Sequence, residues 1–272
     1  FQAEDGIRDR SPSRGLGDVY KRQGEYTMTP FEIIVVPALS DNYIYIAHDT
    51  SNKTTLVVDP SEAAPVLNAL KTRGWTLTHI LNTHHHGDHI GGNKELIDKF
   101  NPTLIGPLSE ESRIPNMHKM VKEGDKINVG GHEGLVFETP GHTHGHIAVW
   151  FKDSDALFCG DTLFALGCGR VFEGTMEQMW DSLKKLRSLP ISTKIYCGHE
   201  YTLQNSNFCI ANDSGNLKLK NKILEINKKL KNALPTIPST LADELECNIF
   251  LKAKDLESFS KLRDLKLSLI HI

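Results

Sequence analysis

The chain is poor in the features that mark membrane, secreted and nucleic-acid-binding proteins. Its 272 residues contain no run close to eighteen apolar residues, so the sequence predicts no transmembrane helix. The charged N-terminal stretch lacks the apolar segment of a secretory signal. Lysine and arginine number 31 against 34 aspartates and glutamates, and this net charge of −3 disfavours a nucleic-acid partner.

Cysteine is also scarce. There are five cysteines, an odd number without a Cys-x-x-Cys pair, which favours a reducing compartment. We therefore expect a cytoplasmic protein. We also expect it to act as a monomer. Each cysteine is expected to be a small buried side chain rather than a nucleophile.

The two ends of the chain are unusual. Asp18–Gln23 and Leu267–Ile272 can be encoded by strings that are reverse complements over their whole length. Inverted ends of this kind are typical of transposon-derived adapters in sequencing libraries. We interpret residues 1–23 as a non-native, adapter-derived leader and residues 267–272 as an adapter-derived tail that replaces the native C-terminus. The alternative is a polar native leader.

Short β-branched and aromatic runs alternate with helical segments along most of the remaining chain. Strands are expected at Phe31–Ala38, Tyr43–Ala47, Thr55–Asp59, Thr78–Asn82, Thr103–Gly106, Gly134–Glu138, His146–Phe151, Ala156–Gly160 and Lys194–Cys197. Helices are expected at Ala63–Arg73, Lys94–Phe100 and Met176–Leu189. This alternation favours a layered α/β domain over residues 24–201. Leucine and isoleucine at helical spacing then predict a smaller, all-helical domain over residues 202–266.

The most informative stretch is Thr83–His89, which holds four potential metal ligands: His84, His86, Asp88 and His89. Neutral imidazoles and carboxylates are ligands of zinc, iron and manganese. Side chains at i and i+2 of an extended segment point the same way, whereas Asp88 and His89 lie beyond a glycine turn. The spacing therefore predicts two adjacent metals, with one pair of ligands for each.

Three further segments place ligand-type side chains at the ends of predicted strands. His142 lies in a turn rich in proline and glycine, and Asp161 and His199 each follow an apolar strand. Taken alone, His142 or His199 would more often be an ordinary loop residue than a ligand. Together with the first motif these residues make seven ligands, which is enough for two metals.

The other histidines near these segments are interpreted as non-ligands: His85, His132, His144 and His146. His85 lies between two ligands on an extended segment and should face the opposite side. His144 and His146 are expected to orient a ligand or a turn through hydrogen bonds.

With these motifs the chain resembles the glyoxalase II (hydroxyacylglutathione hydrolase) family of the metallo-β-lactamase superfamily, over about residues 31–266. The superfamily resemblance rests on the ligand motifs. The narrower one rests on Gly160–Phe164, Gly167–Thr175 and Cys197–Thr202. Pro235–Leu241 and the Arg263-x-x-Lys266 pattern in the helical domain add to it.

The resemblance implies an αββα sandwich with a C-terminal helical domain. It implies one metal held by His84, His86 and His142, a second held by Asp88, His89 and His199, and Asp161 as the bridge together with a water or hydroxide. Asp88 and Asp161 are the predicted catalytic carboxylates, although coordination should keep Asp88 anionic. The cofactor is expected to be two divalent ions, zinc first, with iron or manganese as alternatives.

The same resemblance implies hydrolysis of S-(2-hydroxyacyl)glutathione, with S-D-lactoylglutathione as the leading substrate, in methylglyoxal detoxification. The positions that match glutathione contacts of the family are Arg170, Phe172, Tyr201, Arg263 and Lys266. Cationic groups suit a ligand with two carboxylates. Some members have tyrosine at the position of Phe172, and their hydroxyl has no counterpart here. The alternative for Arg263 and Lys266 is a pair of solvated charges on a terminal helix.

Two rival functions remain open at this point. A glutathione persulfide dioxygenase of the same superfamily would use one iron and have a reduced or missing helical domain. A non-enzymatic scaffold would bind metal for structure only, but structural zinc sites are usually closed at four ligands, whereas seven ligands for two metals leave open positions. A β-lactamase or lactonase is disfavoured by Gly167–Thr175, which resembles a glutathione-type loop.

Overall fold

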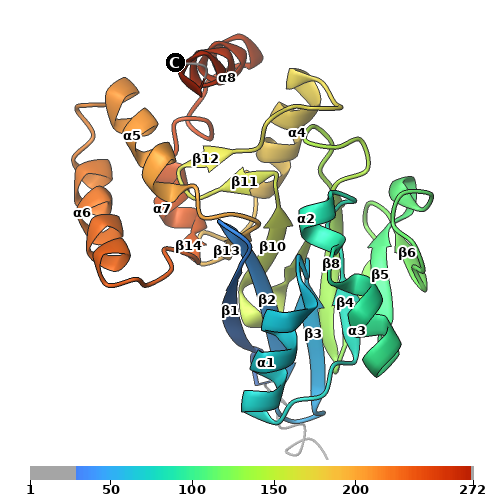
Figure 1. Ribbon diagram of the computed structural model, residues 1–272. Coiled ribbons are helices and arrows are strands. Elements are labelled where there is room, and N and C mark those ends of the chain that lie inside the picture. Colours follow the sequence, from blue (N-terminus) through green and yellow to red (C-terminus); the bar gives the residue numbers. More distant parts are fainter. Residues whose placement is uncertain (1–28, 271–272) are drawn as a thin grey trace, which may run out of the picture.

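Two sheets face each other and helices cover their outer faces, so the expected αββα sandwich is confirmed (Figure 1). The computed structural model describes residues 29–270. The interpretation of residues 1–23 as a leader therefore falls outside the described residues, as do positions 271–272 of the interpreted tail. Within residues 29–270, no helix combines the length and apolar character needed to cross a bilayer.

The first sheet contains, in spatial order, β1 (Glu32–Ala38), β2 (Asn42–Asp49), β3 (Thr54–Val58), β4 (His79–Leu81), β5 (Thr103–Pro107) and β6 (Lys119–Val121). β1 to β3 are antiparallel, and β3 to β6 run parallel. Every residue of β2 is buried. Because side chains alternate along a strand, Tyr43 and Tyr45 enter the core between the sheets, while Ile44 and Ile46 enter a second core beneath the helices.

That second core joins the first sheet to α1 (Ala63–Arg73) and α3 (Asn93–Phe100) through Val66, Leu70 and Leu96. The sequence predicted α1 with its observed bounds. It ends there because Gly74, at φ 68°, adopts the left-handed conformation that glycine tolerates. Between β4 and α3 lies the short helix α2 (Gly87–Ile90), and a 3-10 turn, η1 (Leu108–Glu110), follows β5.

The second sheet has the order β14 (Ser239–Thr240), β13 (Lys194–Cys197), β10 (Ala156–Gly160), β9 (Ile147–Phe151), β8 (His132–Glu138) and β7 (Lys126–Val129). A 3-10 turn, η2 (Lys152–Ser154), joins β9 to β10, and a small hairpin of β11 (Leu163–Phe164) and β12 (Gly167–Cys168) follows β10. Helix α4 (Met176–Arg187) buries Met179 and Leu183 in the core of this half. It begins with a capping box between Thr175 and Gln178.

The C-terminal part is formed by α5 (Thr202–Asn212), α6 (Leu217–Lys231), α7 (Leu241–Cys247) and α8 (Leu256–Ile270), drawn in orange and red in Figure 1. The short strand β14 lies within this otherwise helical part and pairs with β13. Helix α8 packs on α4, where the rings of Phe259 and Trp180 stack with centroids 5.3 Å apart. Through this contact α8 packs against the sandwich domain.

Candidate active site

All the predicted metal ligands lie at one edge of the sandwich. His84 and His86 follow β4, and Asp88 and His89 lie in α2 directly after them. The turn from β8 to β9 brings in His142. Asp161 and His199 follow the parallel neighbours β10 and β13. The two sheets meet here, because the backbone N–H of Tyr43 donates to the carbonyl of Gly198 (2.8 Å).

The predicted ligands form two groups of three, each with its ligand atoms within 4.8 Å of one another: His84, His86 and His142, and Asp88, His89 and His199. A third group of the same kind, Asp59, His84 and His89, shares its two histidines with these. In the first group, Nδ1 of His86 lies 3.1 Å from Nε2 of both His84 and His142. Ligands on a tetrahedral metal with bonds of 2.0–2.1 Å would be about 3.3 Å apart. The spacing of these nitrogens therefore fits a shared cation.

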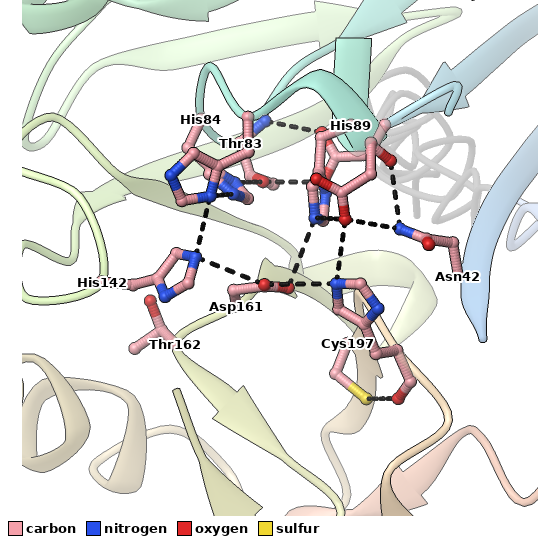
Figure 2. A network of polar contacts seen from close by, with 12 residues as sticks. Asn42, Thr83, His84, His89, His142, Asp161, Thr162 and Cys197 are labelled. Carbon is pink, nitrogen blue, oxygen red and sulfur yellow. Dashed lines mark hydrogen bonds and ion pairs between the residues drawn. The ribbon is translucent and has the colours of Figure 1, made fainter. Parts of the chain in front are cut away.

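Asp161 lies between the two groups (Figure 2). Its Oδ2 is 3.4 Å from Nε2 of His142 and 3.3 Å from Nε2 of His199, while its Oδ1 is 3.5 Å from Nε2 of His89. Buried Oδ1 of Asp161 and Nε2 of His89 both lack a hydrogen-bond partner. Buried polar atoms without a partner are costly, and a divalent cation would satisfy both.

Hydrogen bonds behind the ligands direct bare nitrogen lone pairs into the centre. Nδ1 of His142 donates to the carbonyl of Arg170 (2.9 Å), and Nδ1 of His199 donates to Asp41 (2.9 Å). Nδ1 of His89 donates to Asp59 in the same way (3.0 Å). When the outer nitrogen carries the proton, Nε2 is free to bind a metal. The donor set and its orientation fit two divalent cations.

The ligand-orienting residues Asp41, Asn42 and Asp59 were not identified from the sequence. Asp59 accepts from the backbone N–H and the hydroxyl of Thr83 as well as from His89, which fixes the start of the histidine motif. The side-chain amide of Asn42 donates to Oδ2 of Asp88 (3.0 Å). Only the Asp59–Pro60 step, at the end of a predicted strand, was a visible signal. His146 accepts from the backbone N–H of Asp161 (3.1 Å), a hydrogen bond of the kind that the sequence analysis expected of this histidine.

Burial and the charges of neighbouring groups determine the protonation states at the centre. Burial lowers the pKa of His84, His86 and His142, which keeps these imidazoles neutral and able to bind a metal. For Asp161, burial acts in the opposite direction, but the surrounding imidazoles, His89 first, hold its pKa well below the usual range. The carboxylates therefore stay anionic and require compensating positive charge.

Gly198 is required by the metal centre itself. A Cβ atom at this position would lie 2.3 Å from Oδ1 of Asp161 and 2.7 Å from Cε1 of His89. Both atoms are buried at the centre and cannot move aside without displacing a ligand. Any side chain at position 198 would therefore disrupt the second ligand group.

The metal centre opens into a cleft of about 370 Å³. The cleft is lined by His86, Asp88, His142, Asp161, Phe164, Cys168, Arg170, Phe172, His199, Tyr201, Gln204, Asn205, Arg263 and Lys266. All five predicted substrate contacts are among these residues. The structure therefore brings them together in one cavity with the ligands.

Arg263 and Lys266, both on α8, supply cationic groups to this cleft. Arg263 is only 1% exposed, so it is not the solvated terminal charge that the sequence left as an alternative. Its Nε and Nη2 are buried without a partner, and its guanidinium lies 5.4 Å from the ring of Phe250. Burial lowers the pKa of Lys266 to about 8, and its Nζ contacts Oδ1 of Asn205. A buried guanidinium with unused donors calls for an anionic ligand.

The remaining predicted contacts lie at the metal end of the cleft. The ring of Tyr201 stacks on His199 at 4.8 Å, with an angle of 1° between the planes. Phe172 is 61% exposed, and its ring lies 5.2 Å from His142. Arg170 lines the cleft with its side chain and accepts from His142 with its backbone. These residues form a wall beside the ligands.

Comparisons with known proteins agree with this geometry. Residues 37–199 match the family described as "Metallo-beta-lactamase superfamily", and residues 200–268 match "Hydroxyacylglutathione hydrolase C-terminus". The chain is 52% identical to the hydroxyacylglutathione hydrolase of Pelagibacter ubique (strain HTCC1062), over 86% of this chain and 98% of that protein. It is 46% identical to the hydroxyacylglutathione hydrolase of Methylococcus capsulatus, over 85% and 90%. Among solved structures it is similar to ETHE1 from Myxococcus xanthus, with a TM-score of 0.67 and 26% identity. The match covers 87% of this chain and 90% of that one.

Proposed function

Because the chain belongs to the hydroxyacylglutathione hydrolase family of the metallo-β-lactamase superfamily, we propose that it hydrolyses S-(2-hydroxyacyl)glutathione thioesters. The products are a 2-hydroxy acid and glutathione, and S-D-lactoylglutathione is the leading substrate. One observation carries the proposal. A single cleft has convergent metal ligands at one end. At the other end lies the guanidinium of Arg263, whose Nε and Nη2 lack partners, beside Lys266.

The cationic end suits the glutathione part of such a substrate. Glutathione has two carboxylates, and a guanidinium and an ammonium can bind them through charge-assisted hydrogen bonds. Arg263 is already buried and held over Phe250, so little conformational freedom is lost when a carboxylate binds. This end therefore orients the thioester toward the ligands.

The residues of the metal end have distinct tasks. His84, His86 and His142 would hold one cation, Asp88, His89 and His199 the other, with Asp161 between them. When bound, two divalent cations supply a hydroxide nucleophile at neutral pH and Lewis acidity toward a carbonyl oxygen. Asp161 must remain anionic throughout, and its imidazole neighbours keep it so.

The chemistry of the leaving group explains why the chain needs no dedicated proton donor. A thiol has an ordinary pKa of about 8.5, so its thiolate leaves without prior protonation. The nearest phenol, Tyr201, has its pKa raised by burial and stays protonated, which suits a hydrogen-bond donor to the substrate. Tyr201 is therefore assigned to binding.

We propose zinc as the resident metal, with iron or manganese as alternatives, because imidazole nitrogens and carboxylate oxygens suit all three. We further propose that the enzyme works as a monomer in the cytoplasm, in methylglyoxal detoxification. The five free, buried cysteines support a reducing compartment. A membrane or nucleic-acid partner is not part of the proposal.

The rival persulfide dioxygenase is disfavoured by two observations. The structure gathers a three-histidine group, His84, His86 and His142, beside Asp88, His89 and His199, whereas that enzyme would need only one iron held by two histidines and one carboxylate. Residues 200–268 match the hydroxyacylglutathione hydrolase C-terminus and form helices α5 to α8, which the rival would lack in whole or in part. A purely structural metal site is disfavoured by the open cleft beside the ligands.

The test is a thioester assay on protein of measured metal content. We expect metal-loaded protein to hydrolyse S-D-lactoylglutathione and His86→Ala to lose turnover while remaining folded. Arg263→Met keeps most of the buried volume but removes the cation. This variant should raise KM roughly tenfold or more with kcat little changed, the pattern of lost uniform binding. Oxygen consumption on glutathione persulfide, without thioester hydrolysis, would establish the rival instead.

A further inference from the structure

A loop of residues 169–174, here called the mouth loop, joins the β11–β12 hairpin to α4 and carries both Arg170 and Phe172. It is attached on one side to the turn that holds ligand His142. The carbonyl of Arg170 accepts from His142, and the N–H of Gly174 donates to the carbonyl of Gly141 (3.1 Å). The mouth loop therefore already touches the metal centre through its backbone.

A second attachment comes from Glu173, whose side chain pairs with Arg113. The guanidinium of Arg113 donates from both terminal nitrogens to the two carboxylate oxygens of Glu173, at 2.6 and 3.0 Å. Oε2 of Glu173 also accepts from the backbone N–H of His144 (2.9 Å). This bidentate geometry fixes the relative orientation of the two side chains as well as the distance between them. One carboxylate thus ties together the mouth loop, the turn after η1 and the His142 turn.

Arg113 is attached to a buried residue, Glu110. The backbone N–H of Arg113 donates to the carbonyl of Glu110, which is itself 1% exposed. Oε2 of Glu110 pairs with Nδ1 of His85 (2.9 Å), and Oε1 accepts from the hydroxyl of Thr143 (2.5 Å). Gly145 allows this approach, because a Cβ there would lie 2.4 Å from Cγ of Glu110. Glu110 therefore connects Arg113 to the segment of His85 and to the turn that contains Thr143.

The pair itself is partly exposed, with 41% of the Arg113 side chain and 21% of the Glu173 side chain accessible. Ion pairs of this exposure contribute little to global stability. Its geometry nevertheless determines where the mouth loop lies. Phe172, directly before Glu173, projects over His142 and His86 with ring centroids 5.2 and 6.2 Å away.

We propose that Arg113 and Glu173 are positioning residues for substrate capture: their ion pair holds the mouth loop so that Arg170 and Phe172 form a fixed wall of the cleft beside the metal ligands. The inference rests on the proposed hydrolysis of glutathione thioesters. Neither residue lines the cleft, so both act through the loop rather than on the substrate.

The test compares Arg113→Ala, Arg113→Lys and Glu173→Gln with a control, Lys184→Ala, which removes an exposed ion pair to Asp181 on α4. We expect Arg113→Ala to raise KM about five- to tenfold with kcat within twofold of the parent. Arg113→Lys keeps the charge but loses the bidentate contact, so its KM should lie between those of the parent and Arg113→Ala. Glu173→Gln keeps an acceptor for His144, and its effect should not add to that of Arg113→Ala. Lys184→Ala should match the parent.

A second readout does not depend on turnover. Amide hydrogen exchange should become faster in residues 169–175 in Arg113→Ala, and remain unchanged in Lys184→Ala. If Arg113→Ala matches Lys184→Ala in both KM and exchange, the inference is wrong. It is equally wrong if Arg113→Ala loses melting temperature while KM stays at the parent value. A parent protein inactive on thioesters would overturn the proposed function, and the exchange comparison would still decide whether the pair holds the loop.

Discussion

Asp41 binds no metal in the proposed centre, yet its carboxylate fixes the orientation of ligand His199. Nδ1 of His199 donates to it at 2.9 Å, and the side chain of Asp41 is 40% exposed at the rim. Without this acceptor the imidazole can rotate or bind a proton on the wrong nitrogen. Metal affinity therefore depends on residues that never touch the ion.

We predict that Asp41→Ala weakens metal binding at the Asp88–His89–His199 group by about 10- to 100-fold. Chelator competition, with the two equivalents of metal resolved, measures this directly. Asp41→Asn retains a side-chain oxygen that can accept from His199, and should lose much less. Equal metal affinity in parent and Asp41→Ala would show that the contact is dispensable.

The sequence predicted the ligands because each stands in a short motif whose chemistry is visible locally. It could not predict Asp41, which lies 158 residues from its partner His199. Nor could it decide whether Arg263 was solvated, since arginine on an amphipathic helix is ordinarily exposed. Tertiary packing buries that side chain, because α8 packs against α4 and the guanidinium lies beside Phe250 and the carbonyl of Cys168.

Among the elements, α8 has the clearest influence on the site, because it presents Arg263 and Lys266 to the cleft. Phe259, on the same helix, is fully buried and stacks on Trp180 of α4. Aromatic pairs of this kind bury a large apolar area and fix the relative position of two helices. The position of the cationic end of the cleft therefore depends on this stack.

We predict that Phe259→Ala lowers the free energy of unfolding by about 3–5 kcal/mol, the usual cost of emptying an aromatic core position. KM should also rise, because α8 loses its contact with α4. Urea denaturation and steady-state kinetics measure the two effects. Leu265→Ala, at a position on α8 that is 44% exposed, is the matched control and should change neither quantity appreciably.

Several elements were predicted with their observed bounds, whereas five short strands were not predicted. The helix Ala63–Arg73 and the strands Ala156–Gly160 and Lys194–Cys197 have their predicted bounds. The strands β6, β7, β11, β12 and β14 were missed. Two to four residues provide no periodicity, and such strands exist only because a distant partner offers hydrogen bonds. The β11–β12 hairpin, which precedes the mouth loop, consists of two such strands.

For the molecule as a whole, Glu244 of α7 links the helical part to that hairpin. Its Oε2 accepts from the backbone N–H of Leu166 (2.8 Å) and from the amide of Asn248 (2.9 Å). The carboxyl is 1% exposed, and burial raises the pKa of Glu244 to about 7. Ionisation of Glu244 is therefore coupled to the stability of the contact between α7 and the β11–β12 hairpin.

Between its ordinary pKa near 4.5 and about 7, the folded protein keeps a proton on Glu244 that the unfolded chain has released. The contribution of this group to stability must then fall as the pH rises through that window, by on the order of 3 kcal/mol in total. We predict that Glu244→Gln removes this part of the pH dependence. Urea unfolding of parent and variant at pH 5, 6, 7 and 8 tests it, and parallel curves would contradict it.

The metal ligands all lie between positions 84 and 199, whereas Arg263 and Lys266 come from the final helix. On the proposed function, the metal ligands and the cationic end of the cleft thus come from consecutive stretches of the chain. Recombination after His199 could retarget an unchanged hydrolytic centre to acyl carriers other than glutathione. The incoming segment would need a carboxylate in the place of Glu244, so that the backbone of Leu166 keeps its acceptor.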